Sequence, residues 1–206
     1  MSRIAAPTRE ERPDLERYFG AIESRMGFLP NSTLAMANVP GMVEAISGMA
    51  RVIYSPDAKT PLQLRNLVGQ IASQAAGCTY CTAHSASNAA QSGIEDARIA
   101  AVWDFETSPL FSPAEKAAFH FALAAGVHPN AVTDELVEDL GNHYDAQEMS
   151  ELMAVIAWFG LLNRWNDSMA TPLEDYPLVV ARRTLTRTGW RPGAHDPDWE
   201  PDKTDG

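Results

Sequence analysis

Hydrophobic residues recur at helical spacing along most of the chain. The clearest stripe follows Pro40, where apolar side chains three or four positions apart predict a helix over residues 39–53. A second stripe, over residues 64–75, predicts the next helix. The alternation of apolar and polar positions that is typical of a half-buried strand is hard to find. The pattern therefore predicts an all-α protein.

Capping and helix-breaking residues indicate where these helices begin and end. Thr60 and Gln63 have the spacing of a capping box, and Pro61 between them suits the first turn of the second helix. Gly77 is expected to end that helix, and a third then covers about 78–92. Further helices are predicted over about 94–103, 112–125 with Ser112 as its cap, 134–143 and 146–166.

The chain is predicted to form a single domain over residues 1–190, followed by a disordered, Pro- and Asp-rich tail over 191–206. A shift of 85 positions aligns the apolar stripe of residues 64–75 with that of the last long helix, which suggests two repeated units, about 40–105 and 112–175. Any two amphipathic helices can align in this way, so duplication and coincidence both stay open.

Composition and charge exclude several classes of protein. The chain has 206 residues, and its 27 acidic against 16 basic residues give a net charge of -11, which repels nucleic-acid backbones. No apolar run approaches the roughly 18 to 20 residues that cross a bilayer. The first residues also lack the apolar core of a secretory signal. We expect a cytoplasmic protein with neither a nucleic-acid nor a membrane partner.

Two cysteines, Cys78 and Cys81, carry the candidate chemistry. On a helix, residues three apart lie about 60° from one another, so the two thiols can form a disulfide. The preceding glycine predicts that the pair opens a helix, whose free N–H groups and dipole stabilise a thiolate. A thiolate attacks peroxides and disulfides, and His84 can accept the thiol proton or pair with the thiolate.

Other interpretations of the same residues stay open at this point. Free cysteines are often small buried hydrophobic residues, without chemistry of their own. Cys78, Cys81 and His84 can also be read as zinc ligands, although a closed structural site needs four and no further ligand pair is evident. A single histidine on a helix is commonly a structural residue.

The segment Cys78-Thr79-Tyr80-Cys81-Thr82-Ala83-His84, preceded by an amphipathic helix, resembles the alkylhydroperoxidase AhpD/carboxymuconolactone decarboxylase family, in particular its two-unit peroxidase-related members. Gly27–Ser32 and Leu162–Asp167 support the resemblance, which covers roughly residues 10–175. It implies an all-α, AhpD-like helical bundle that assembles into homo-oligomers. No cofactor and no metal are implied.

The resemblance also implies a thiol peroxidase or disulfide oxidoreductase activity. Cys81 is then the peroxidatic cysteine that attacks a small organic hydroperoxide, Cys78 is the resolving cysteine, and His84 belongs to the proton relay. An external dithiol or disulfide reductant is the expected second partner.

Two positions depart from the family pattern. The family glutamate twelve residues before the first cysteine is Asn66 here, which cannot act as a base. The family histidine four residues after the second cysteine is Ser85, with His84 one place earlier. The 85-residue shift aligns Asn66 with Glu151, so Glu151 is a candidate replacement, although a glutamate on the polar side of its helix is the favoured explanation. Asn66, Tyr80, Ser85 and Glu151 are therefore the possible supporting residues.

Two other functions remain alternatives. One is a non-redox, carboxymuconolactone decarboxylase-like enzyme, against which the cysteine pair argues. The other is a non-catalytic or redox-sensing helical oligomer, which the asparagine at position 66 favours.

Overall fold

The computed structural model describes residues 2–196, 198 and 199, and every regular element within them is helical, which confirms the all-α prediction. The α-helices are α1 (Glu16–Met26), α2 (Asn31–Met36), α3 (Met42–Ile53), α4 (Leu62–Ala75), α5 (Thr79–Gln91), α6 (Asp96–Ala101), α7 (Pro113–Gly126), α8 (Asp134–Gly141), α9 (Ala146–Met169) and α10 (Asp175–Thr184). Short 3-10 turns are η1 (Pro13–Leu15), η2 (Val102–Asp104), η3 (Thr186–Thr188) and η4 (Gly193–His195). None of the described helices is long and apolar enough to cross a membrane.

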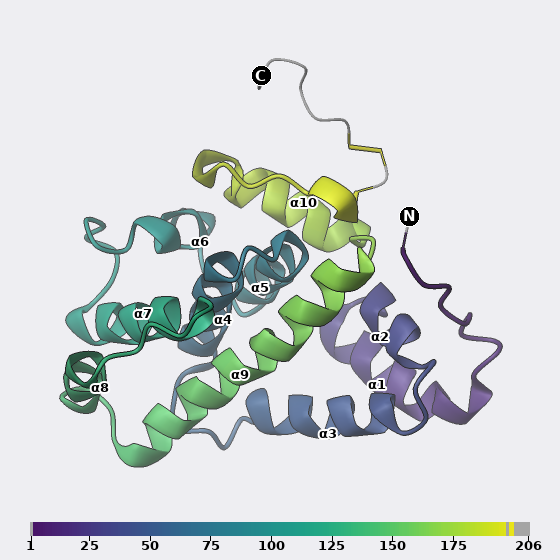
Figure 1. The fold of residues 1–206 in the computed structure, drawn as a ribbon, viewed down its shortest axis with the longest axis horizontal. Coiled ribbons are helices and arrows are strands. Elements are labelled where there is room, and N and C mark those ends of the chain that lie inside the picture. Colours follow the sequence, from purple (N-terminus) through teal and green to yellow (C-terminus); the bar gives the residue numbers. More distant parts are fainter. Residues whose placement is uncertain (1, 197, 200–206) are drawn as a thin grey trace.

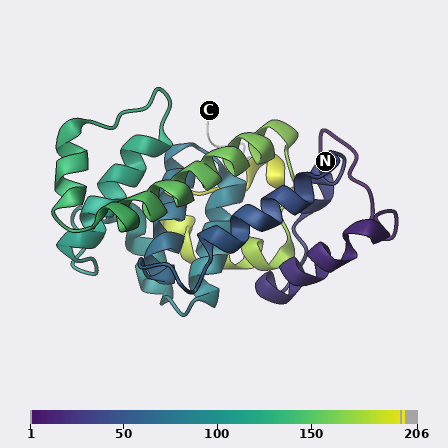
Figure 2. The same cartoon turned by 90° about the horizontal axis from the view of Figure 1, so that it is seen from below.

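The centre of the molecule is the pair α4 and α5, which pack against each other along their length. The long helix α9 crosses both, α7 packs on α4, and α10 packs on α5 (Figure 1). The N-terminal helices α1, α2 and α3 form a separate layer at one end, and α3 lies beside α9 (Figure 2). This arrangement encloses the start of α5 between α9 and the N-terminal helices.

The predicted helices from residue 39 to residue 166 are present, and most of their end signals act as expected. Gly77 has a positive φ of 79°, the left-handed conformation that ends a helix, and Ser112 forms the expected capping box with Glu115. The prediction that Thr60 caps helix α4 is wrong. Pro61 occupies the N-cap of α4 without a side-chain bond, while the Thr60 hydroxyl donates to Glu151 on α9 at 2.8 Å.

Helices α1, α2 and α10 were not predicted from the sequence. The apolar stripe of α1 holds Phe19, Ile22 and Met26 at helical spacing, and its other positions are mostly charged or polar, so the signal of an amphipathic helix was present in the sequence and was missed. In α10, Pro177 is a helix-breaking signal, yet it lies in the first turn, where its missing N–H needs no partner. These helices form because they pack against the core that the predicted helices make.

The expected disordered tail over 191–206 differs from the structure in its first residues. His195 is buried, and its Nδ1 lies 2.7 Å from the carbonyl oxygen of Thr171 while its Nε2 lies 3.2 Å from Asp167. The His195 carbonyl also accepts the Leu173 N–H at 2.7 Å. Residues 191–196 are therefore held by the connection between α9 and α10, although their composition is that of a linker. Residues 197 and 200–206 lie outside the described residues.

The second proposed unit is not a copy of the first in its helix boundaries. Helix α9 runs unbroken through Met169, past Leu162, the position that the 85-residue shift aligns with Gly77. Helix α4 and the start of α5 thus correspond to one continuous helix in the second half, and the rest of α5 corresponds to the connection between α9 and α10 and the first residues of α10. Internal duplication stays a prediction.

Close packing of α4 on α9 makes a testable prediction about Gly69. A Cβ on Gly69 would lie 2.3 Å from Cε2 of Phe159, so this ring has to move. Overpacking costs about 1–3 kcal/mol, and the better helix propensity of alanine offsets up to about 1 kcal/mol. We expect Gly69→Ala to lower the free energy of unfolding by about 1–2 kcal/mol in a urea titration. The matched control is Gly160→Ala in α9, where a Cβ meets nothing within 4 Å and a gain is expected. Equal gains for both variants would contradict this account of the contact.

Candidate active site

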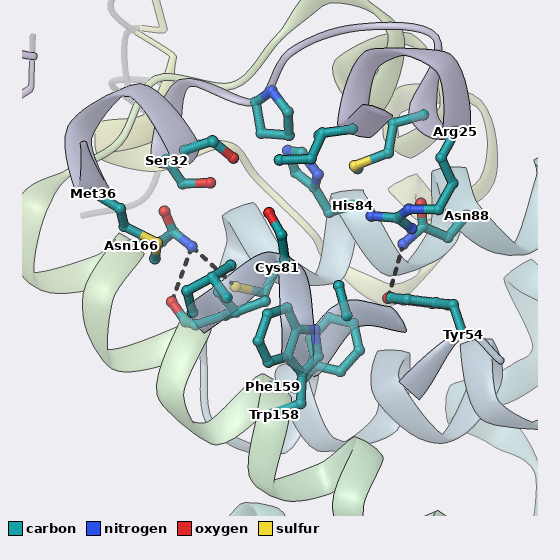
Figure 3. Close-up of a pocket in the computed structure, with 18 of the residues that line it drawn as sticks. Arg25, Ser32, Met36, Tyr54, Cys81, His84, Asn88, Trp158, Phe159 and Asn166 are labelled. Atoms are coloured by element: carbon teal, nitrogen blue, oxygen red, sulfur yellow. Dashed lines mark hydrogen bonds between the residues drawn. The ribbon is translucent and has the colours of Figure 1, made fainter. Parts of the chain in front are cut away.

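A cavity of about 80 Å³ lies where α5 meets α9 and the N-terminal helices (Figure 3). Its walls are mostly apolar or aromatic, and Trp158 and Phe159 of α9 close one side. Cys81 and His84 of α5 face it, with Asn166 of α9 beside the sulfur. A thiol, an imidazole and an amide therefore line one largely apolar cavity.

The cysteine pair occupies the first turn of α5, as predicted. Cys78 is the N-cap residue, and its Sγ accepts a hydrogen bond from the Cys81 N–H at 3.3 Å. Both are free thiols and buried, yet Cys81 lines the cavity and Cys78 does not. The fold thus divides the pair into one sulfur that faces the cavity and one behind it.

The surroundings of the two sulfurs differ. Burial raises the pKa of the Cys78 thiol, and the adjacent Cys81 raises it further, so Cys78 stays protonated at neutral pH. The Cys81 sulfur accepts a hydrogen bond from Nδ2 of Asn166 at 3.6 Å and lies at the N-terminus of a helix. An N–H donor and the N-terminal end of a helix are both groups that interact favourably with negative charge. The 85-residue shift aligns Asn166 with Cys81 itself, so the two matching positions meet in space.

His84 is held by a carboxylate that the sequence analysis did not identify. Its Nε2 lies 2.7 Å from Oε2 of Glu174, the N-cap residue of α10. The same carboxylate accepts the Tyr80 hydroxyl at 2.9 Å and the Asn31 N–H at 2.5 Å. Tyr80 also stacks on the His84 ring, with 4.3 Å between the centroids. Glu174, Tyr80 and His84 therefore form one connected group beside the cavity.

Glu174 is ionised within this group although it is largely buried. Burial by itself would raise the pKa of Glu174, but the charge and hydrogen bond of His84 and the Asn31 N–H lower it below its ordinary value. The contact with this ionised carboxylate fixes the orientation of the His84 ring. His84 is thus held beside the cavity by a charged partner.

Local sequence patterns carried no signal for Glu174. It lies 90 positions after His84, in the loop before a helix that was itself not predicted. Only the packing of α10 on α5 brings the two side chains together. The carboxylate that the family pattern places before the first cysteine is absent there, and a carboxylate from another part of the chain contacts the histidine.

Three of the proposed supporting residues lie away from the cavity lining. Asn66 donates to the Asn88 carbonyl at 3.2 Å and to the Ser92 hydroxyl at 3.1 Å, near the opposite end of α5 from the cysteines. The Ser85 hydroxyl bonds within its own helix to the Cys81 carbonyl at 2.8 Å. Both have structural partners, and only Tyr80 of the supporting residues reaches the cavity.

Glu151 does not lie where a replacement base would have to lie. Its carboxylate accepts the backbone N–H groups of Lys59 and Thr60 at 3.1 and 2.9 Å, which ties the connection before α4 to α9. Burial opposes ionisation, but hydrogen bonds from Thr60, Gln147 and Lys59 lower the pKa of Glu151 to about 2. A carboxylate with so low a pKa and such partners is a structural anchor, and the repeat alignment does not bring it to the thiols.

The zinc alternative finds little support in the geometry. Among residues 2–196, 198 and 199, no group of three or more His, Cys, Asp and Glu side chains is arranged to hold a metal ion. His84 directs its Nε2 to Glu174, and the Cys78 sulfur accepts the Cys81 N–H. The His84 nitrogen and the Cys78 sulfur therefore already contact other groups of the protein.

Known proteins resemble this chain in both sequence and fold. The model of the carboxymuconolactone decarboxylase family matches residues 40–124. The protein YnjA of Escherichia coli (strain K12) is 33% identical over 128 residues, which are 61% of this chain and 70% of YnjA. A structure described as an alkylhydroperoxidase AhpD core, a peroxidase-related protein from Ralstonia eutropha JMP134, has 21% identity and a TM-score of 0.77 over 88% of this chain and 96% of its own.

The debrominase Bmp8 is similar over nearly its full length. Its apo structure is 31% identical, with a TM-score of 0.82, and the match covers 88% of this chain and 97% of Bmp8. A Bmp8 variant with a cysteine replaced by alanine, in complex with 2,3,4-tribromopyrrole, matches with 30% identity and a TM-score of 0.84 over 89% of this chain and 100% of its own. The motif, the fold and these full-length similarities agree: the chain belongs to the carboxymuconolactone decarboxylase family and has the AhpD-like fold.

Proposed function

We propose that the protein is a thiol-dependent reductase in which Cys81 attacks an oxidising substrate in the cavity and Cys78 resolves the product as a disulfide. The different positions of the two sulfurs carry this proposal. Cys81 lines the cavity, while the Cys78 sulfur lies behind it and accepts a hydrogen bond from the Cys81 N–H. An attacking thiolate has to meet the substrate, whereas a resolving thiol has to meet only the other sulfur.

A small organic hydroperoxide is the first candidate substrate. The Cys81 thiolate attacks the terminal peroxide oxygen, so that an S–O bond forms, the O–O bond breaks and Cys81 becomes a sulfenic acid. The leaving alkoxide takes up the proton that the Cys81 thiol gave to His84. The Cys78 thiol then attacks the Cys81 sulfur and its proton leaves with the hydroxyl group as water. Two thiols and ROOH thus yield a disulfide, ROH and water, and an external dithiol restores the pair.

The neighbouring side chains support each step of this scheme. The Asn166 amide donates to the attacking sulfur, and the Glu174 carboxylate holds His84 ready to pass a proton. The raised pKa of Cys78 keeps its proton in place until the sulfenic acid forms. The mostly apolar and aromatic walls offer few hydrogen-bonding partners to water beside Cys81, which favours the sulfenic acid over side reactions.

A halogenated aromatic ring is the second candidate substrate, favoured by the full-length similarity to a debrominase and by the aromatic cavity walls. As in the reaction with a hydroperoxide, the two thiols supply the two electrons that reduce the substrate. Attack of the Cys81 thiolate on bromine leaves the C–Br electron pair on carbon, which takes a proton from His84. Cys78 then displaces bromide from the Cys81 sulfur, so that two thiols and ArBr yield a disulfide, ArH and HBr.

One experiment tests the proposal and ranks its two substrates. The reduced protein is mixed with one equivalent of cumene hydroperoxide or of 2,3,4-tribromopyrrole, and the cysteine peptides are mapped by mass spectrometry. We expect loss of two hydrogens at Cys78 and Cys81, with one equivalent of cumyl alcohol from the first substrate or of bromide from the second. If both thiols stay reduced with both substrates, the redox proposal is wrong and the non-redox, decarboxylase-like alternative gains support.

The expected partners belong to the same proposal. An external dithiol or disulfide reductant closes the cycle, and the protein acts as a homo-oligomer. Oxidation in the absence of reductant should therefore stop after a single turnover, and addition of a dithiol such as dihydrolipoamide should restore turnover.

A further inference from the structure

A surface groove of about 600 Å³ runs between α1 and α3, beside the thiol cavity. The groove and the cavity adjoin, because they share wall residues. The shared residues are Ile22, Arg25, Ser47, Ala50 and Tyr54. A substrate that reaches Cys81 in the cavity can therefore also contact Arg25, which lines both spaces.

Positive charge is concentrated in this groove. Arg17 and Arg25 of α1 and Arg51 of α3 line it, and none of the three forms an ion pair with another described residue. No Asp or Glu is among the described residues that line the groove or the cavity. In a chain with 27 acidic and 16 basic residues, this is a local reversal of the overall charge. Such a site attracts anions.

Arg25 has the chemistry to bind a planar anion at this junction. Its guanidinium carbon lies 4.5 Å from the centroid of the Tyr54 ring, a cation–π contact that places its charge beside the cavity without a carboxylate partner among the described residues. Figure 3 shows Arg25 on the side of the cavity that holds Tyr54 and Asn88. At the same junction, the buried hydroxyl of Ser47 has no hydrogen-bond partner among the described residues. The edge of a guanidinium matches the two oxygens of a carboxylate.

We propose that this groove binds the carboxylate of an amphipathic substrate, with Arg25 as the principal contact and Arg17 and Arg51 supplying further positive charge. The apolar part of the substrate then lies between the aromatic walls, and its reducible bond reaches Cys81. This inference names the substrate class of the proposed reductase and rests on that function. The expected substrates are carboxylated hydroperoxides or carboxylated halogenated aromatic compounds.

Binding can be measured without any redox chemistry. Benzoate and benzamide have nearly the same shape and differ in charge, and each is titrated into the reduced protein by isothermal calorimetry. Because a charge-assisted, bidentate hydrogen bond is favourable, we expect benzoate to bind about tenfold more tightly than benzamide. The preference should weaken as salt rises. Equal affinities, or no binding of benzoate, would overturn the inference.

The matched variants are Arg25→Gln in the groove and Arg187→Gln in η3, which make the same change in net charge. Arg187 is exposed and lies outside the groove. Arg25→Gln should remove the preference for benzoate, and Arg187→Gln should retain it. Loss in both variants would show a general effect of net charge and contradict a site at Arg25. Because this assay involves no oxidation, it can fail while Cys81 is oxidised by hydroperoxide, or succeed while it is not, so the two proposals are tested separately.

Discussion

Cys81→Ser is expected to abolish the reaction with hydroperoxide, while Cys78→Ser is expected to retain the first step and stop the cycle there. The reason is the position of the two sulfurs: Cys81 faces the cavity, and Cys78 contacts the Cys81 N–H behind it. A serine hydroxyl is a far weaker nucleophile than a thiolate, so loss of Cys81 should lower the rate by at least about a thousandfold. The measurement is the rate of hydroperoxide consumption in a single turnover.

The two variants are controls for each other, since both replace sulfur with oxygen in one turn of α5. In Cys78→Ser, the sulfenic acid on Cys81 should accumulate and react with dimedone, and the adduct should map to Cys81 by mass spectrometry. In Cys81→Ser, no adduct should form, because the raised pKa of Cys78 keeps it a protonated, buried thiol at neutral pH. A dimedone adduct on Cys78 would instead reverse the proposed roles.

Glu174→Gln is expected to slow the oxidation of Cys81 about ten- to a hundredfold while the protein stays folded. Glutamine has the same shape and retains an oxygen for the Tyr80 hydroxyl and the Asn31 N–H, but it removes the charge opposite His84. His84 then loses the charged partner that fixes its ring, so its proton transfer is impaired. The measurement is the rate of single-turnover oxidation against pH, in which the profile of the variant should differ from that of the original protein.

Stability against pH gives a second measurement on Glu174. The folded-state pKa of this carboxyl lies below its ordinary value, so its stabilising contribution is fully present above the unfolded pKa of about 4.3. That contribution is lost as the pH falls through the folded pKa. Urea titrations at neutral and at acidic pH should therefore show a smaller acid sensitivity in Glu174→Gln than in the original protein.

Asp175→Asn is the matched control, because it removes one negative charge from the neighbouring, exposed residue. It should leave both the oxidation rate and its pH profile unchanged. If Glu174→Gln behaves like this control, the carboxylate has no part in the relay. If Glu174→Gln lowers stability but leaves the pH profile of oxidation in place, Glu174 is a structural partner of His84 and not a positioning residue for proton transfer.

Much of the fold was evident in the sequence because it depends on local interactions. Apolar spacing over residues 39–53 and 64–75 predicts helices, since residues three or four apart share one helix face. Gly77 marks a boundary because its positive φ is accessible to glycine at low energy. The cysteine spacing likewise places both thiols in one turn. These features require only the chain within a few positions of each residue.

Tertiary structure decided the remaining features of the site, because they join residues far apart in the chain. Glu174 reaches His84 only through the packing of α10 on α5, and Asn166 reaches Cys81 only through the crossing of α9. The groove beside Arg25 exists only where α1 lies against α3. By itself the sequence determined an all-helical chain with a thiol pair at a helix start. Long-range packing alone selected which thiol faces the cavity, which carboxylate holds the histidine and where positive charge gathers, because no local pattern encodes a contact between distant helices.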